Sequence, residues 1–219
     1  MSKWTQHPAF PYIIPLAAFF IVHLAISGLH EDAQYISYPI ATMVCIFLVF
    51  YNLAKYPPLF QFKKLVPTVL VGMVAACLWI VPYTYITSVD PDPTAGFNPE
   101  IFESKDIQIC LIIIRMIGFC IMIPLVEEIF WRGFLQRYLI EEDFETVKLG
   151  SYTHLSFFAT SLMIVLAHSD QWGVAIIWAL LSSSWFIYTR SLGSMILLHA
   201  VTNFTLGVYI IVTKSWYFW

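Results

Sequence analysis

Charged residues are scarce in this chain of 219 residues. Aspartate, glutamate, lysine and arginine together make up 11% of it, whereas hydrophobic residues make up 59%. A soluble domain is roughly 25% charged, so this composition excludes one. The formal net charge is −3 and the basic residues form no cluster, which argues against a nucleic-acid partner. The long apolar runs instead predict a polytopic membrane protein with the lipid bilayer as its surroundings.

Cysteine is also rare, and its positions show neither a zinc-binding nor a disulfide pattern. The four cysteines lie at irregular spacing inside apolar runs, at Cys45, Cys77, Cys110 and Cys120. We interpret them as small buried hydrophobic side chains. The chain also lacks a His-Glu-x-x-His sequence and an internal repeat. No small-residue cleavage site follows the first apolar run, so we expect a retained helix there rather than a signal peptide.

Seven apolar segments have lengths typical of membrane-spanning helices. They are 10–29, 36–54, 65–87, 107–140, 152–168, 172–188 and 192–213, with a polar loop at 88–106. As one helix, Ile107–Ile140 would reach about 50 Å, well beyond a hydrocarbon core of about 30 Å. We therefore predict a single all-α integral membrane domain, 1–219, with about seven transmembrane helices. There would be eight if Ile107–Ile140 is broken at Pro124.

Lysine and arginine are distributed unevenly between the loops on the two sides of this predicted bundle. One side and the N-terminus carry Lys3, Lys55, Lys63, Lys64, Arg137, Lys148 and Arg190, whereas the other side carries Lys105 and Lys214. Positive charge in short loops is typical of the cytoplasmic side. We therefore expect the N-terminus to be cytoplasmic and the C-terminus to be outside, in a plasma membrane such as the bacterial inner membrane.

Two adjacent acids, Glu127 and Glu128, interrupt the fourth apolar segment, and Arg132 follows four residues after the second. On a helix, residues i and i+4 share a face, so Glu128 and Arg132 are expected to pair. Glu127 points about 100° away and has no obvious local partner. A charged residue at membrane depth indicates a functional site. The pattern therefore favours a structural Glu128–Arg132 pair and a free Glu127 that acts as a general base.

Three further polar residues fall at a similar depth. At the helical rise, His168 lies about 24 Å from Tyr152, and His199 and Asn203 lie about 10 and 17 Å from Leu192. An unbroken fourth helix puts Glu127 about 20 Å above the same inner surface. His199 and Asn203 also share one helix face. We therefore expect a carboxylate, two imidazoles and an amide to meet around one interior space.

These residues form three motifs in a recognisable order. They are Glu127-Glu128-x-x-x-Arg132, then His168 four residues after Ile164, then His199-x-x-x-Asn203. In this pattern the chain resembles the CAAX protease and bacteriocin-processing (CPBP, or Abi) family of intramembrane proteases over roughly 124–203. The family has phenylalanine where this chain has Ile164, a departure at a packing position. The stretches 137–140, 143–144, 149–150 and 199–203 and the tryptophan-rich C-terminus resemble the exosortase-associated branch, the CAAX prenyl protease-related proteins.

The resemblance implies an endopeptidase that cuts near the C-terminus of membrane-tethered protein substrates, with its catalytic helical core at 107–213. Glu127 and His168 would activate water, and His199 and Asn203 would form the oxyanion site. Glu128 and Arg132 would be structural support, and no cofactor would be needed. An exosortase-linked role, together with the charge distribution, favours a site that opens to the outside.

Three other functions fit parts of the same pattern. In a zinc protease, Glu127, His168 and His199 would be the metal ligands and water the fourth. In a non-catalytic membrane binding or immunity protein, the same scaffold would be retained without hydrolysis. In a transporter, the intramembrane acid and histidine residues would carry ions or protons, although such proteins commonly show an inverted repeat.

Overall fold

The computed structural model describes residues 6–86 and 96–219, and within these ranges the chain forms helices and no strands. The predicted all-α membrane bundle is therefore confirmed. Six helices are long and apolar enough to cross a membrane, and a seventh apolar helix is shorter. The predicted polar loop falls partly outside the described residues. Its described end contains a short 3-10 turn at Pro99–Ile101, and the next helix begins at Lys105.

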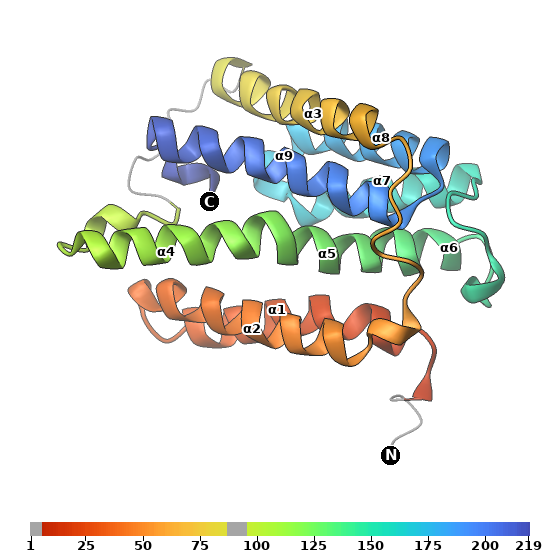
Figure 1. Ribbon diagram of the computed structural model, residues 1–219, viewed down its shortest axis with the longest axis horizontal. Coiled ribbons are helices and arrows are strands. Elements are labelled where there is room, and N and C mark those ends of the chain that lie inside the picture. The colour runs from red at the N-terminus through yellow and green to blue at the C-terminus, as the bar shows by residue number, and fades with distance from the viewer. Residues whose placement is uncertain (1–5, 87–95) are drawn as a thin grey trace.

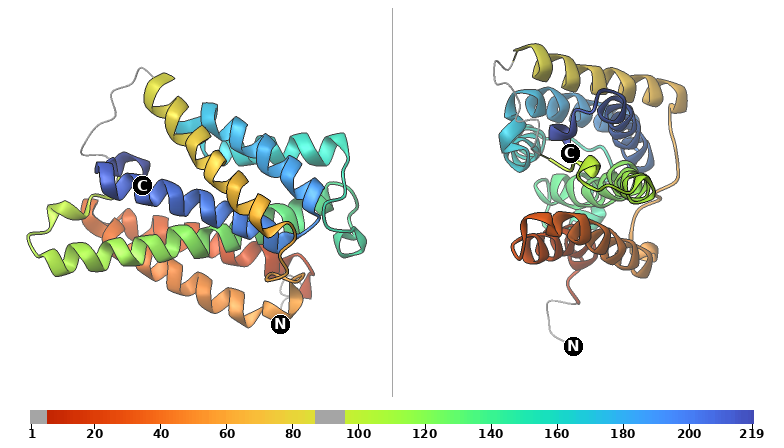
Figure 2. Two further views of the ribbon diagram at one scale, coloured as in Figure 1. Left: turned by 45° about the horizontal axis from the view of Figure 1, so that its top comes forward. Right: turned by 90° about the vertical axis from the view of Figure 1, so that its left-hand side faces the viewer.

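The helices pack in three layers (Figures 1 and 2). On one side lie α1 (Phe10–Ser27) and α2 (Gln34–Tyr51), which pack against each other. A long central helix contains α4, α5 and α6. On its other side lie the remaining helices, α3 (Leu65–Ile86), α7 (His154–Ala167), α8 (Trp172–Thr189) and α9 (Leu192–Thr213). The central helix therefore contacts both outer layers, and its acidic residues lie in the middle of the bundle.

The central helix runs without interruption from Lys105 to Tyr138. It consists of α4 (Lys105–Ile117), α5 (Ile123–Glu128) and α6 (Gln136–Tyr138), joined by wide π-helical turns at 118–122 and 129–135. The possible break at Pro124, with eight spans, is therefore wrong. Proline in a regular α-helix clashes with the carbonyl group four residues earlier. The π-helical turn just before Pro124 bonds Ile123 N–H to Gly118 O instead, and this wider geometry accommodates the ring.

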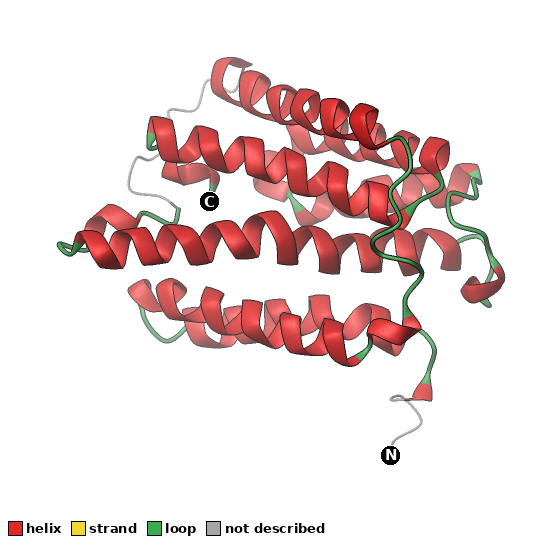
Figure 3. Cartoon of the chain, in the orientation of Figure 1, coloured by secondary structure: helices red, strands yellow, loops and turns green. Residues whose placement is uncertain are grey.

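Helix α7 is short, and this decides where its C-terminal end lies. A capping box begins it, in which Thr153 accepts a hydrogen bond from Ser156 N–H and Ser156 accepts one from Thr153 N–H. Its 14 residues rise only about 21 Å, less than the thickness of a hydrocarbon core. The turn into α8 therefore lies part-way along the bundle, short of the end where α9 finishes (Figure 3). His168, at this turn, is thus within the bundle.

The residues after α9 fold back onto the bundle. Lys214 adopts a left-handed conformation and reverses the chain, and a 3-10 turn follows at Trp216–Phe218. The Lys214 ammonium contacts the Glu100 carboxylate at 2.7 Å, and Phe97 N–H donates to Trp219 O at 3.2 Å. The tail therefore covers the end of the bundle at which α9 finishes and α4 begins (Figure 1).

Candidate active site

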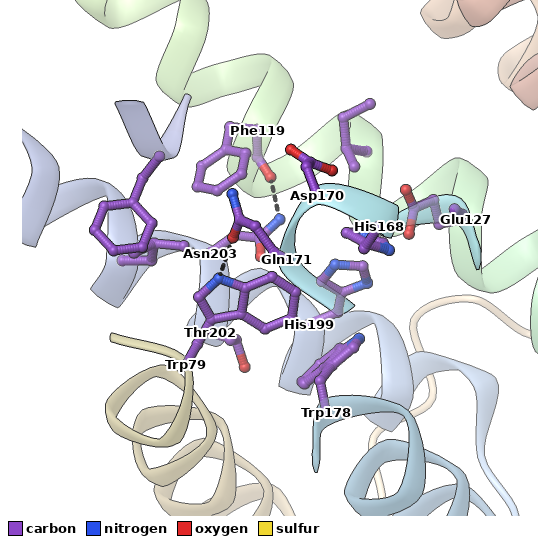
Figure 4. Close-up of a pocket in the computed structure, with 14 residues that line it drawn as sticks. Trp79, Phe119, Glu127, His168, Asp170, Gln171, Trp178, His199, Thr202 and Asn203 are labelled. Atoms are coloured by element: carbon purple, nitrogen blue, oxygen red, sulfur yellow. Dashed lines mark hydrogen bonds between the residues drawn. The ribbon is translucent and has the colours of Figure 1, made fainter. Parts of the chain in front are cut away.

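A cavity of about 150 Å³ lies between the central helix, α9 and the α7–α8 turn. Its lining includes Glu127 from α5, His168 from the end of α7, and His199 and Asn203 from α9 (Figure 4). The structure thus brings the four predicted catalytic residues to one space. Glu128 and Arg132, predicted as support, do not line it. They are buried beside it.

Glu127 occupies a special place on the central helix. It lies in the short α5 segment between the two wide turns, and irregular turns of this kind are frequent at functional sites. It is half-buried and faces the cavity. In the described part of the chain, its carboxylate makes no hydrogen bond or ion-pair contact. Both carboxylate oxygens are therefore available to a water molecule in the cavity.

The orientation of His168 follows from a bond to its own helix. Its Nδ1 lies 2.9 Å from Ile164 O. A carbonyl oxygen can only accept, so Nδ1 carries a proton. The neutral ring then has its lone pair on Nε2, which is the nitrogen free to take a proton from water. His168 and Glu127 make no direct hydrogen bond among the described residues, although both line the cavity.

Glu128 joins two of the three motifs by a contact that the sequence analysis missed. Its Oε1 accepts a hydrogen bond from His199 Nδ1 at 3.0 Å, while its Oε2 lies 3.6 Å from Arg132 Nε. The Glu128 side chain is 2% exposed and that of Arg132 is 0% exposed. The predicted pair is therefore present as a buried ion pair, and it also orients an imidazole of the cavity.

Arg132 also connects the central helix to α8. Its Nη2 donates to Ser182 Oγ at 2.9 Å, and Ser182 in turn donates to Ala179 O at 3.2 Å. The 3.6 Å distance between Arg132 Nε and Glu128 Oε2 is too long for a hydrogen bond. Arg132 Nε and Nη1 have no hydrogen-bond partner in the described structure. Charge attraction to Glu128 is thus the main compensation for burying this guanidinium.

The amide of Asn203 is fixed by the central helix. Its Nδ2 donates to Phe119 O at 2.8 Å, shown as a dashed line in Figure 4. Phe119 lies in the first wide turn of the central helix. An amide nitrogen has two hydrogens, so one remains for a group in the cavity. This second hydrogen is a candidate oxyanion donor.

Several lining residues were not predicted from the sequence. They are Trp79, Phe119, Ile123, Ala167, Asp170, Gln171, Trp178, Thr202, Leu206 and Phe218. Asp170 was detectable, because it follows His168 by two residues in the same turn. Trp79 on α3 and Phe218 in the tail are distant in sequence from the motifs and carry no local signal. They also lie outside the predicted core at 107–213.

The geometry does not fit the alternative zinc site. Among the described residues, no three His, Cys, Asp or Glu side chains are grouped so that they could hold a metal ion. Glu127, His168 and His199 therefore do not form a ligand set in this arrangement, and we derive no step through a metal.

Comparisons with known proteins give a consistent assignment. No curated protein and no solved structure matches the chain. A protein-family model, described as type II CAAX prenyl endopeptidase Rce1-like, matches residues 109–205. This range contains Glu127, His168, His199 and Asn203, and the match confirms the resemblance found in the three motifs. The segment that carries these cavity residues therefore matches the Rce1-like family of CAAX intramembrane proteases.

Proposed function

We propose that this protein hydrolyses a peptide bond near the C-terminus of membrane-tethered protein substrates, without a metal. The family supports a CAAX-type intramembrane endopeptidase in general. The observation that carries the finer proposal is the cavity itself, where a free carboxylate, an oriented imidazole and two potential hydrogen-bond donors share one space inside an apolar bundle. Hydrolysis needs a base for water and donors for the developing oxyanion.

Glu127 and His168 form the water-activating half of the proposed mechanism. A water molecule attacks the carbonyl carbon while its proton passes to Glu127 or to His168 Nε2. The carbonyl oxygen becomes an oxyanion. When the intermediate collapses, the C–N bond breaks and the stored proton passes to the leaving amine. Glu127 suits this task because its carboxylate lines the cavity and makes no hydrogen bond or ion pair among the described residues.

Asn203 and His199 form the oxyanion-binding half. One Nδ2 hydrogen of Asn203 is bonded to Phe119 O, and the second is donated to the oxyanion. His199 donates from Nε2, and because Nδ1 already carries a hydrogen for Glu128, this requires the imidazolium form. Glu128 supplies the counter-charge for that form at 3.0 Å. Glu128 therefore acts through His199 as a positioning residue.

Glu127→Gln tests the assigned base. We expect cleavage to fall by about 10²–10⁴-fold, the usual contribution of general base catalysis, with the protein still folded. The measurement compares protein C-termini by proteomics in cells that express the wild type or the variant. The control is Glu142→Gln, which removes an exposed acid outside the cavity. Retained cleavage in Glu127→Gln would refute the assignment. Unchanged C-termini even between wild type and a deletion would favour a non-catalytic binding or immunity protein.

Chelation separates this mechanism from the zinc alternative. We expect purified protein to keep its cleavage activity after treatment with a chelator and removal of zinc, verified by elemental analysis. In the proposed mechanism Glu127 and His168, which line the cavity, activate water without a metal. A loss of activity that added zinc restores would contradict this and favour the zinc protease.

The exosortase association and the membrane of residence stay predictions.

A further inference from the structure

His168 occupies a position that its own helix cannot fully define. It follows the last residue of α7, and its backbone, with φ −120° and ψ 46°, has left the helical conformation. Its ring makes one contact within α7, from Nδ1 to Ile164 O. Helix ends fray, because their terminal groups lack partners within the helix. A base used in catalysis needs a fixed direction, so its orientation requires a contact from outside α7.

Trp79 of α3 supplies that contact. Its ring meets the His168 ring edge-on, with centroids 5.7 Å apart and an interplanar angle of 74°. Its indole Nε1 donates to Gln171 Oε1 at 2.8 Å, shown as a dashed line in Figure 4. Gln171 N–H in turn donates to His168 O at 2.9 Å, which closes the turn between them. One indole therefore contacts both ends of the turn that holds His168.

We propose that Trp79 and Gln171 are positioning residues for His168, a role that rests on the proposed function of His168 as a base. Both side chains line the cavity together with His168. The indole edge limits rotation of the imidazole, and the bond to Gln171 stops the turn from shifting along α3. Nε2 of His168 is thereby kept toward the cavity. Trp79 lies outside residues 109–205, so this contact couples α3 to the segment that matches the family.

The chain offers a closely matched control at the other end of the helix pair α3 and α8. Trp185 on α8 donates its indole Nε1–H to Thr68 Oγ1 on α3 at 3.2 Å. Trp79 and Trp185 are both half-buried, and each indole ties α3 to α8 or to the turn that precedes it. Trp185 does not line the cavity or contact His168. Trp185→Phe therefore removes the same kind of bond without affecting the proposed site.

The first measurement reads the His168 ring directly and does not depend on catalysis. Histidine labelled with ¹⁵N reports which ring nitrogen carries the proton, and the His168 signals are assigned by their loss in His168→Gln. We expect wild type and Trp185→Phe to show the Nδ1–H form. Trp79→Phe and Gln171→Met should move the His168 signals toward a mixture of the two forms, because the ring and its turn are released.

The second measurement uses the substrates identified by the C-terminal proteomics. We expect Trp79→Phe to lower kcat about ten-fold with little change in KM, since a small misplacement of a catalytic group commonly costs this much or more. Gln171→Met should lower kcat by a similar factor. The kcat of the double variant should be no lower than that of either single variant, because both substitutions remove the same Trp79–Gln171 hydrogen bond. Trp185→Phe should retain wild-type kcat.

Two outcomes would overturn the positioning role. The first is a Trp79→Phe variant whose melting temperature falls like that of Trp185→Phe while its His168 signals and kcat stay unchanged. The second is additive loss of kcat in the double variant. If the wild type shows no cleavage while the His168 signals of Trp79→Phe and Gln171→Met shift as expected, the positioning contact is supported. Only the proposed function then fails.

Discussion

At the scale of single residues, the site depends on which atoms are left without partners. Glu128 is shared between His199 and Arg132, whereas the neighbouring Glu127 forms no hydrogen bond or ion pair with either in the described structure. Two identical side chains thus take different roles because the helix turns them about 100° apart. The one that faces α9 is a buried counter-ion, and the one that faces the cavity is the proposed base.

Arg132→Ala should damage both folding and activity. It leaves the Glu128 carboxylate buried without its arginine, which costs roughly 3–5 kcal/mol of stability. Thermal unfolding in detergent and the cleavage assay measure the two effects. Arg190→Ala, which removes an exposed arginine, is the control. The double variant Glu128→Gln with Arg132→Met should recover much of the stability but not the activity. A stable and fully active Arg132→Ala protein would show that the pair is unimportant.

At the scale of elements, two departures from regular helices build the cavity. The wide turns on either side of α5 carry the central helix past Pro124 and set the direction of Glu127. The shortness of α7 stops His168 within the bundle instead of at its end. A longer α7 would carry His168 past the depth of Glu127, and regular turns in the central helix would rotate the Glu127 side chain to another direction. The site therefore requires both irregularities.

Thr153→Ala should destabilise the protein by about 1 kcal/mol, because it removes the side-chain cap that begins α7. Chemical or thermal unfolding measures the loss. Thr146→Ala is the control, since its hydroxyl bonds only Asp143 O in an exposed turn. His168 lies at the opposite end of α7, so kcat should change little. Equal stability of the two variants would mean that the capping box does not stabilise α7 in the membrane.

At the scale of the whole molecule, α1 begins at one end of the bundle and α9 finishes at the other (Figure 1). The lysine and arginine distribution predicts that the end where α1 begins is cytoplasmic. The cavity is lined by Phe218 of the tail, at the end where α9 finishes. We therefore propose that the site opens toward the outside.

Cysteine labelling of a cysteine-free variant tests this orientation. We expect Glu103→Cys, an exposed position just before α4, to react with a membrane-impermeant maleimide in intact cells. Glu142→Cys, an exposed position beyond α6 at the other end, should react only after the cells are lysed. Gel-shift or mass analysis reads the labelling. The reverse labelling pattern would place the N-terminus outside and would contradict the proposal that the site opens outward.

The sequence by itself determined the features that depend on near neighbours along the chain. Apolar run lengths predicted the helices, because each backbone group in a bilayer must bond within its own segment. The spacing of Glu128 and Arg132 predicted their pairing, and three motifs indicated the family whose model matches residues 109–205. The helical rise predicted that Glu127, His168, His199 and Asn203 lie at similar depth.

Only the tertiary structure decided the contacts between segments far apart in the chain. Local periodicity cannot reveal that Glu128 orients His199, or that Trp79 lies against His168 and Phe218 lines the cavity. These depend on how helices rotate and pack against one another, and that packing is set by the side chains of several helices at once. The continuity of the central helix at Pro124 was likewise decided there. Whether the helix bends or widens at a proline depends on its neighbours and not on the proline alone.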